Sequence, residues 1–121
     1  MNVQPQERYI LHIAPRSLWE QGKDSEVYQG DTLESEGFIH CSKANQVVAV
    51  ANTLFLGRTD LVLLLIQTSR VVSPIKYEGA ASEVFPHIYG PLNRDAVIAV
   101  YDFLPNEHGE FQLPEEVIRH D

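Results

Sequence analysis

The residues best suited to chemistry are three histidines in separate segments of the chain, accompanied by a serine, a glutamate and a tyrosine. They are His12, His40, Ser42, Glu83, His87 and Tyr89. Histidine changes its charge near neutral pH, and a carboxylate beside it can assist acid–base catalysis or stabilise a developing cation. The sequence therefore predicts that these side chains line one groove, provided that the fold brings their segments together.

His12 lies in an alternating segment, residues 9–13, that has the pattern of a β-strand. Alternation places its side chain on the face opposite Leu11 and Ile13, where it could line a groove. The alternative is a histidine that is hydrogen-bonded inside a core or points to solvent, which is the commoner situation for a lone histidine in a strand.

His40 and Ser42 share one face of a second predicted strand, residues 37–42, with Phe38. Ser42 also stands where it could cap a helix over residues 44–55, whose apolar side chains follow three-and-four spacing. The amides at that helix N-terminus could then hold an anion such as a diphosphate. The two roles of Ser42 are compatible with one site.

His87 and Tyr89 lie in a stretch, residues 85–92, that two prolines and a glycine restrain. Such a segment holds its side chains still. Glu78 and Glu83 precede it, and either could supply a carboxylate beside the histidines. The alternative is a rigid turn in which Tyr89 packs on the core.

Metal binding and nucleophilic catalysis are both disfavoured by the spacing. Imidazole and thiolate are the usual zinc ligands, but the closest pair, His40 and Cys41, would point to opposite faces of a strand. A cysteine inside a strand favours a buried thiol over a reactive one. The sequence has no Gly-x-Ser-x-Gly elbow, no phosphate-binding glycine-rich loop and no Gly-x-Gly-x-x-Gly fingerprint. We therefore expect no metal, and neither an ordinary hydrolase nor a dinucleotide dehydrogenase.

Composition and charge restrict the class of protein and its partners. A chain of 121 residues with 44% hydrophobic residues has the size and apolar content of one domain. The formal net charge is −8 and the basic residues are scattered singly, so nucleic acid and anionic membranes are poor partners and a small-molecule ligand is the better expectation. A single cysteine, no apolar leader and no membrane-length apolar run predict a cytoplasmic protein.

The order of elements predicts an α+β domain with a mixed, mainly antiparallel sheet and helices packed against it. We expect a disordered N-terminal arm at residues 1–7 and one compact domain at 8–121. The continuous apolar run 60–67 is typical of a central strand, and 96–104 forms a second long strand. The remaining expectations are a helix at 15–21, a polar connection at 21–37, an edge strand at 74–78, irregular structure at 79–95 and a terminal turn at 115–118.

Three phrases of the sequence together resemble a known family. They are Tyr-Ile-Leu-His-Ile at 9–13, Glu-Gly-Phe-Ile-His-Cys-Ser at 36–42 and Phe-Pro-His-Ile-Tyr-Gly-Pro-Leu at 85–92. They resemble the bacterial domain-of-unknown-function family 952, and the likeness extends from about Arg8 to Leu104. That family has no established activity. It is similar in architecture to the ADP-ribosyltransferase fold, a split mixed sheet with a nucleotide groove between its halves.

The resemblance implies a role for each candidate residue. By position, His12 would contact the ribose on the nicotinamide side of NAD, and the strand with His40 and Ser42 would support the nicotinamide pocket. Glu83 would stand for the glutamate that stabilises the ribosyl cation. The catalytic candidates are thus His12, Glu83 and His87, and the ligand-binding candidates are His40, Ser42 and Tyr89.

Two functions and one structural alternative stay open on the sequence. The first is an enzyme, or a degenerate one, that binds NAD or an ADP-ribose-like nucleotide and acts as a ribosyl transferase. The second is a non-catalytic module that binds a small metabolite or a peptide in the same groove. In the third, the histidines and Tyr89 form a hydrogen-bonded network that only specifies the fold. Fold kinship does not decide among them.

Overall fold

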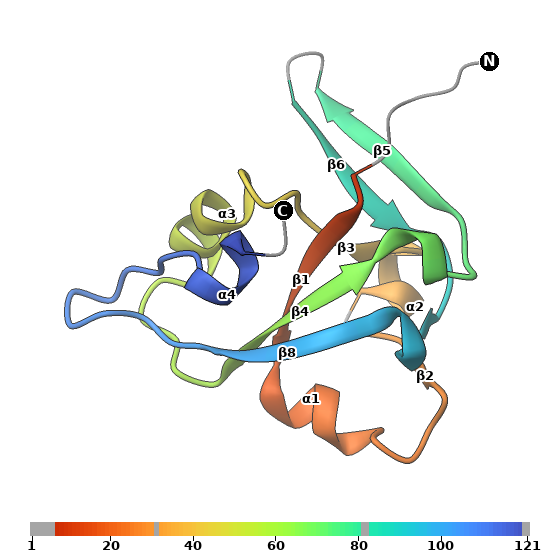
Figure 1. The fold of residues 1–121 in the computed structure, drawn as a ribbon, viewed down its shortest axis with the longest axis horizontal. Coiled ribbons are helices and arrows are strands. Elements are labelled where there is room, and N and C mark those ends of the chain that lie inside the picture. The colour runs from red at the N-terminus through yellow and green to blue at the C-terminus, as the bar shows by residue number, and fades with distance from the viewer. Residues whose placement is uncertain (1–6, 31, 81–82, 120–121) are drawn as a thin grey trace.

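Strands from the beginning, the middle and the end of the chain build the framework. The structure is a computed structural model that describes residues 7–30, 32–80 and 83–119. In chain order the elements are β1 (Tyr9–Pro15), α1 (Arg16–Gln21), β2 (Val27–Tyr28), α2 (Leu33–Glu36), β3 (Ile39–His40), α3 (Val47–Leu54), β4 (Leu61–Gln67), η1 (Thr68–Arg70), β5 (Ile75–Ala80), β6 (Glu83–Ile88), β7 (Leu92–Asn93), η2 (Arg94–Ala96), β8 (Val97–Phe103) and α4 (Glu115–Ile118). Figure 1 shows β1, β4 and β8 crossing the centre, with α3 and α4 to the left and the β5–β6 hairpin extending upward on the right.

The central sheet has the strand order β1-β4-β8, and both of its pairings are antiparallel. Residues 61–66 of β4 are all buried, because the sheet has a hydrophobic core on each face. Successive residues alternate between the two cores: Leu64 packs in one with Ile10, and Leu63 packs in the other with Leu11. The predicted central position of this strand is confirmed.

A second sheet, β3-β6-β5, contains a segment that the sequence predicts to be irregular. Its middle strand is β6, so the prediction of irregular structure over 79–95 is wrong there. Pro86 suggested a break because proline cannot donate to a ladder. In the structure the carbonyl of Pro86 accepts from the amide of Cys41 at 3.0 Å. In an antiparallel strand the nitrogen and the carbonyl oxygen of one residue point to the same neighbour, so the Pro86 nitrogen also faces β3. Pro86 and its partner Tyr77 in β5 therefore exchange no hydrogen bonds, and proline costs none in that pairing. The edge strand predicted at 74–78 is confirmed as β5.

The two sheets meet at a single bridge between β1 and the residue that follows β3 by two positions. Leu11 and Ser42 form an isolated antiparallel bridge, with N···O distances of 2.8 Å in both directions. This bridge places the strand that contains His12 directly beside the strand that contains His40. Two of the chemically interesting segments are therefore brought together by backbone hydrogen bonds.

The helix after β3 begins later than the sequence predicts. α3 starts at Val47 with Gln46 as its N-terminal flanking residue, and no side chain caps it. Ser42 lies before a turn in which the amide of Lys43 donates to Gln46 Oε1 at 2.9 Å. The predicted capping role of Ser42 is therefore wrong, and so is the anion site that depended on it. The apolar stripe is confirmed at Val47 and Ala51, which are buried, whereas Leu54 at its end is exposed.

The polar connection at 21–37 contains two short elements. β2 pairs with β7 in a two-stranded antiparallel sheet, and α2 ends at Gly37 in the left-handed conformation with φ of 88°. Three small antiparallel sheets and four α-helices confirm the predicted α+β class. The structure departs from the predicted mixed sheet, because every strand pairing within 7–30, 32–80 and 83–119 is antiparallel.

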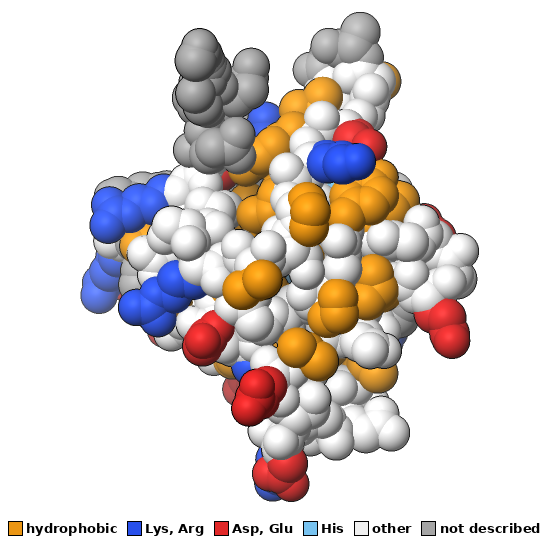
Figure 2. All heavy atoms as spheres, turned by 90° about the vertical axis from the view of Figure 1, so that its right-hand side faces the viewer, with side chains coloured by type: hydrophobic (Ala, Val, Ile, Leu, Met, Phe, Trp, Pro, Cys, Tyr) orange, Lys and Arg blue, Asp and Glu red, His pale blue; other side chains and the backbone are white. Residues whose placement is uncertain are grey.

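The N-terminal arm and the surface complete the description. Residues 1–6 of the predicted arm lie outside the described residues, whereas the Glu7 amide donates to Tyr77 Oη at 3.3 Å. Figure 2 shows several hydrophobic patches over the middle of one face, with charged side chains mostly at its rim. Among the helices that the structure describes, none is long and apolar enough to cross a membrane.

Candidate functional site

A groove with a cavity volume of about 510 Å³ lies where β1, β3, α3 and the β5–β6 hairpin meet. Its lining residues are Leu11, His12, Ile13, Thr32, His40, Cys41, Ser42, Val50, Leu54, Phe55, Glu78, Gly79, Phe85 and His87. We call this cavity the histidine groove. The structure thus brings together His12, His40, Ser42 and His87, while Tyr89 and Glu83 lie outside the lining.

His12 lies at the floor of the groove and is fixed in one orientation. Only 4% of its surface is exposed, and its Nδ1 lies 2.6 Å from the carbonyl oxygen of His40. A carbonyl only accepts, so Nδ1 carries the hydrogen and Nε2 is the acceptor of the neutral ring. Tyr28 Oη, 3.3 Å from Nε2, donates to it, and the two rings meet edge to face.

His40 and His87 face each other across the β3–β6 pairing. The two residues are register partners, and their ring centroids are 5.2 Å apart. His40 Nε2 donates to Glu36 Oε1 at 2.9 Å, and about half of the His40 side chain is exposed. Phe38 stacks on His87 with centroids 4.2 Å apart and also contacts His40. The aromatic ring thus restrains both histidines.

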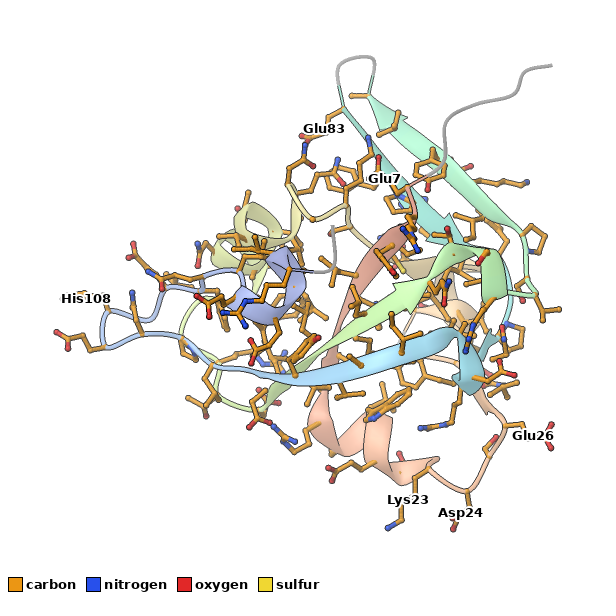
Figure 3. All side chains as sticks on the ribbon, in the orientation of Figure 1. Glu7, Lys23, Asp24, Glu26, Glu83 and His108 are labelled. Atoms are coloured by element: carbon orange, nitrogen blue, oxygen red, sulfur yellow. The ribbon has the colours of Figure 1, made fainter. Side chains whose placement is uncertain are left out.

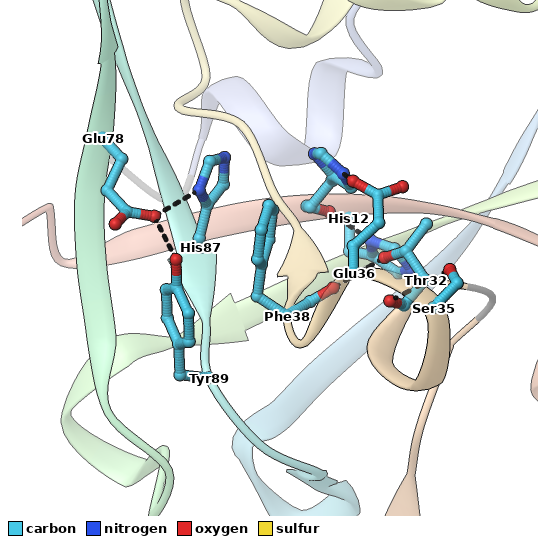
Figure 4. Close-up of polar contacts among 9 residues, drawn as sticks. His12, Thr32, Ser35, Glu36, Phe38, Glu78, His87 and Tyr89 are labelled. Carbon is cyan, nitrogen blue, oxygen red and sulfur yellow. Dashed lines mark hydrogen bonds and ion pairs between the residues drawn. The ribbon is translucent and has the colours of Figure 1, made fainter.

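Glu78 joins His87 and Tyr89 through a single oxygen. Its Oε1 lies 2.8 Å from His87 Nδ1 and accepts from Tyr89 Oη at 2.6 Å. Figure 4 shows this arrangement, with Phe38 on the other side of His87. These hydrogen bonds, first that from Tyr89 and then that from His87, lower the pKa of Glu78. The same contact with Glu78 raises the pKa of Tyr89. The cluster therefore contains a carboxylate and a neutral phenol.

Ser42 and Cys41 contribute a free hydroxyl and an inert thiol. Ser42 is 5% exposed, and within the described residues its hydroxyl has no hydrogen-bond partner, which leaves it available to a ligand. Cys41 is 4% exposed, and its burial raises the pKa of the thiol. A protonated, buried thiol is a poor nucleophile.

Glu83 lies at the start of β6, outside the groove lining. Figure 3 shows it toward the outer end of the hairpin. Its Oε2 accepts from Gln46 Nε2 at 3.3 Å, and Gln46 also donates to the carbonyl of Val84 at 2.8 Å. The glutamate that lines the groove and contacts His87 is Glu78 instead.

The electrostatics of the groove favour a ligand without negative charge at this point. Among the described residues, its lining contains one carboxylate, that of Glu78, and no lysine or arginine. The amine of Lys76 lies 4.6 Å from the ring centroid of Tyr89, behind the cluster. In the part of the chain that the structure describes, no group of three or more His, Cys, Asp or Glu side chains is arranged to hold a metal ion.

The sequence offered both Glu78 and Glu83 as the carboxylate beside the histidines, and the catalytic role was predicted for Glu83. No role was predicted for Tyr28. The β5–β6 hairpin, which was not predicted, is what places Glu78 beside His87. In its register Glu78 pairs with Phe85, and His87 follows Phe85 by two residues on the same face. Had a hairpin been predicted here, its register would have identified Glu78. Tyr28 comes from the polar connection and offers no pattern that could have identified it.

Comparisons with known proteins place this geometry in a family. A family model described as "Protein of unknown function (DUF952)" matches residues 13–100. The crystal structure of protein CC0527 from Caulobacter crescentus is similar, with 28% sequence identity and a TM-score of 0.82 over 91% of this chain and 98% of that one. The solution NMR structure of CC0527 gives a TM-score of 0.77 at 28% identity, over 91% of this chain and 97% of that one. No curated protein matches the chain.

Proposed function

Because the chain belongs to the DUF952 family, whose description assigns no activity, we propose its function from the groove: it binds NAD or an ADP-ribose-like nucleotide there. The ligand would enter through its ribose and nicotinamide end. Ribosyl transfer is the chemistry that this binding would serve.

One observation carries the proposal: histidines from three strands, His12, His40 and His87, meet in one cavity. Converging polar groups in an otherwise apolar cavity are the usual mark of a ligand site. The ADP-ribosyltransferase-like architecture that the family resemblance implies would assign the first-strand histidine to a ribose and the second strand to the nicotinamide pocket. The bridge between Leu11 and Ser42 sets these two strands side by side.

The size and chemistry of the groove support the nicotinamide end of the ligand. Its volume of about 510 Å³ lies within the roughly 300 to 1,000 Å³ typical of small-molecule sites. Val50, Phe55 and Phe85 offer apolar walls to a flat ring. Because no lysine or arginine is among the lining residues that the structure describes, the diphosphate would lie outside the groove, in water.

For ribosyl transfer, the groove would need a carboxylate near the developing cation. The sequence assigns this role to Glu83, but Glu78 is the carboxylate that lines the groove. We therefore propose Glu78 for it, with His87 beside it. In that reaction the bond between the ribose C1′ and the nicotinamide nitrogen breaks, and nicotinamide leaves with the electron pair of that bond. The acceptor forms the new bond to C1′ with its own electron pair and releases its proton to water.

A second candidate is a binding module for a neutral or cationic metabolite that carries no phosphate. The absence of lysine and arginine from the described lining favours it. The two candidates differ in one measurable respect: only the first predicts that the diphosphate-containing ligand NAD binds and releases nicotinamide.

Thermal unfolding with added ligands tests the proposal. A ligand at 100 times its dissociation constant stabilises by about 2.7 kcal/mol, which is about 10 °C for a domain of this size. We expect a shift with NAD that Val50→Trp, which fills the groove, abolishes. Ala49→Trp on the exposed side of α3 is the matched control and should keep the shift. No shift with NAD, ADP-ribose, nicotinamide or nicotinamide riboside would contradict the proposed ligand class.

A further inference from the structure

We infer that Glu78 is a positioning residue of the histidine groove: with Tyr89 it holds His87 in the tautomer whose Nε2 accepts a hydrogen bond from the ligand. The identity of that ligand rests on the proposed function. The tautomer itself does not, because the contacts that set it exist in the protein alone.

The hydrogen bonds of Glu78 determine which nitrogen of His87 carries the hydrogen. An ionised carboxylate only accepts, so both of its partners must donate. Tyr89 Oη donates to Oε1 at 2.6 Å, and His87 Nδ1, 2.8 Å from the same oxygen, must therefore carry its hydrogen. In a neutral imidazole with hydrogen on Nδ1, Nε2 has a free lone pair.

The surroundings hold the ring of His87 in this orientation. Phe38 stacks on it with an interplanar angle of 19°, and the His87 side chain is 14% exposed. Tyr89, which orients Glu78, is itself covered by the amine of Lys76 at 4.6 Å. These contacts come from β5, from β6 and the residue that follows it, and from the residue before β3, so the pairing of these strands maintains them.

Like the hydroxyl of Ser42, His87 Nε2 is a polar atom of the groove that a ligand can hydrogen-bond. Within the described residues, Nδ1 of His87 is engaged by Glu78 while Nε2 has no hydrogen-bond partner, and the ring lines the groove. The lone pair on Nε2 favours a ligand group that donates a hydrogen bond, such as the N–H of a carboxamide or the O–H of a ribose. A carboxylate at the same point would face this lone pair and the charge of Glu78, so the groove excludes it.

Two pyridine ribosides provide a matched pair of probes. Nicotinamide riboside and nicotinic acid riboside share ring and ribose, and they differ in a carboxamide against a carboxylate. We expect titration calorimetry at pH 8 to show the amide binding at least tenfold more tightly, which corresponds to about 1.4 kcal/mol. In Glu78→Ala the ratio of the two dissociation constants should fall below threefold, because the His87 ring can then adopt the other tautomer. Glu78→Gln keeps an acceptor oxygen and should restore the preference, and Glu107→Gln on the distant surface should leave it unchanged.

Nitrogen-15 NMR of the histidine rings in the ligand-free protein tests the same inference without a ligand. We expect His87 to carry its hydrogen on Nδ1 in the unaltered protein and in Glu78→Gln, and to shift toward Nε2–H in Glu78→Ala. A ring with its hydrogen on Nε2 in the unaltered protein would overturn the inference, as would equal binding of the two ribosides. If neither riboside binds and the Nδ1–H tautomer is present, the proposed ligand fails and the positioning role of Glu78 stands.

Discussion

His40 and His87 are register partners in the β3–β6 pairing, and each donates a ring nitrogen hydrogen to a different carboxylate. Glu36 holds His40 from the helix that precedes β3, and Glu78 holds His87 from the neighbouring strand. The two histidines thus have the same kind of partner, and both of their rings contact Phe38. A site built in this way depends on the pairing of β3 with β6 as much as on the histidines themselves.

Replacing Gln46 should destabilise the protein far more than replacing Ser42. Gln46 is 5% exposed, accepts from the amide of Lys43 and donates to the carbonyl of Val84. Gln46→Ala leaves these partly buried groups unsatisfied and should lower the free energy of unfolding by about 1–3 kcal/mol. Ser42→Ala removes a hydroxyl without a described partner and should change it by less than about 0.5 kcal/mol. Urea unfolding of both variants measures the difference, and equal losses would show that Ser42 supports α3 after all.

The buried hydrogen bond of His12 should contribute to stability as well as to the site. His12→Ala removes the donor to the carbonyl of His40, and we expect a loss of about 1–3 kcal/mol in the free energy of unfolding. Tyr28→Phe removes the longer bond at 3.3 Å and should cost about 0.5–1.5 kcal/mol. Urea unfolding again gives both values. A larger loss for Tyr28→Phe than for His12→Ala would mean that the ring is held mainly by Tyr28.

Cys41 should be unreactive in the folded protein. Its burial raises the pKa of the thiol, and only 4% of the residue is exposed. We expect the colour reaction with a disulfide reagent at pH 8 to be slow in buffer and to finish within the mixing time in 6 M guanidinium. Leu54→Cys provides the control, because its side chain is exposed at the groove: one thiol should react at once and the second slowly. Rapid reaction of the unaltered protein would show that the groove opens at Cys41.

Glu78 should make the stability of the protein sensitive to acid. Its pKa is lowered in the folded state by the hydrogen bonds from Tyr89 and His87, from an ordinary value of 4.5. The unfolded chain therefore binds this proton first, and the stabilisation present above pH 4.5 is lost as the pH falls through the folded value. Glu78→Gln should show a shallower decline in the free energy of unfolding between pH 5 and pH 3. Urea unfolding at each pH measures this free energy. If it declined equally in the unaltered protein and in Glu78→Gln, this linkage would be excluded.

The framework could be predicted from the sequence because its signals are local. The apolar run of β4 and the spacing of α3 each identify an element without knowledge of its neighbours. The α+β class follows from such elements. The β5–β6 hairpin could not be predicted, because Pro86 signals a break and its harmless orientation depends on the partner strand. Which glutamate lies beside His87, Glu78 or Glu83, depends on the register of that hairpin. It could therefore not be predicted either.

The role of Ser42 shows how a local rule can select the wrong partner. Ser42 has the residue type and the position of a helix cap, but its backbone is engaged in the bridge with Leu11. The turn that follows moves the start of α3 to Val47, where Gln46 rather than a serine supports the chain. A tertiary contact thus overrides a capping preference of about 1 kcal/mol.

The most direct measurement maps a ligand onto the protein. Titration of the nitrogen-15 labelled protein with nicotinamide riboside should shift the amide signals of the groove, above all those of His12, Ser42 and Phe85. Signals in β8, the edge strand of the central sheet opposite β1, such as that of Ala99, should stay unchanged. Saturable shifts confined to the groove, and lost in Val50→Trp, are the predicted result. Shifts that gather elsewhere, or that survive in Val50→Trp, would contradict the assignment of the histidine groove as the ligand site.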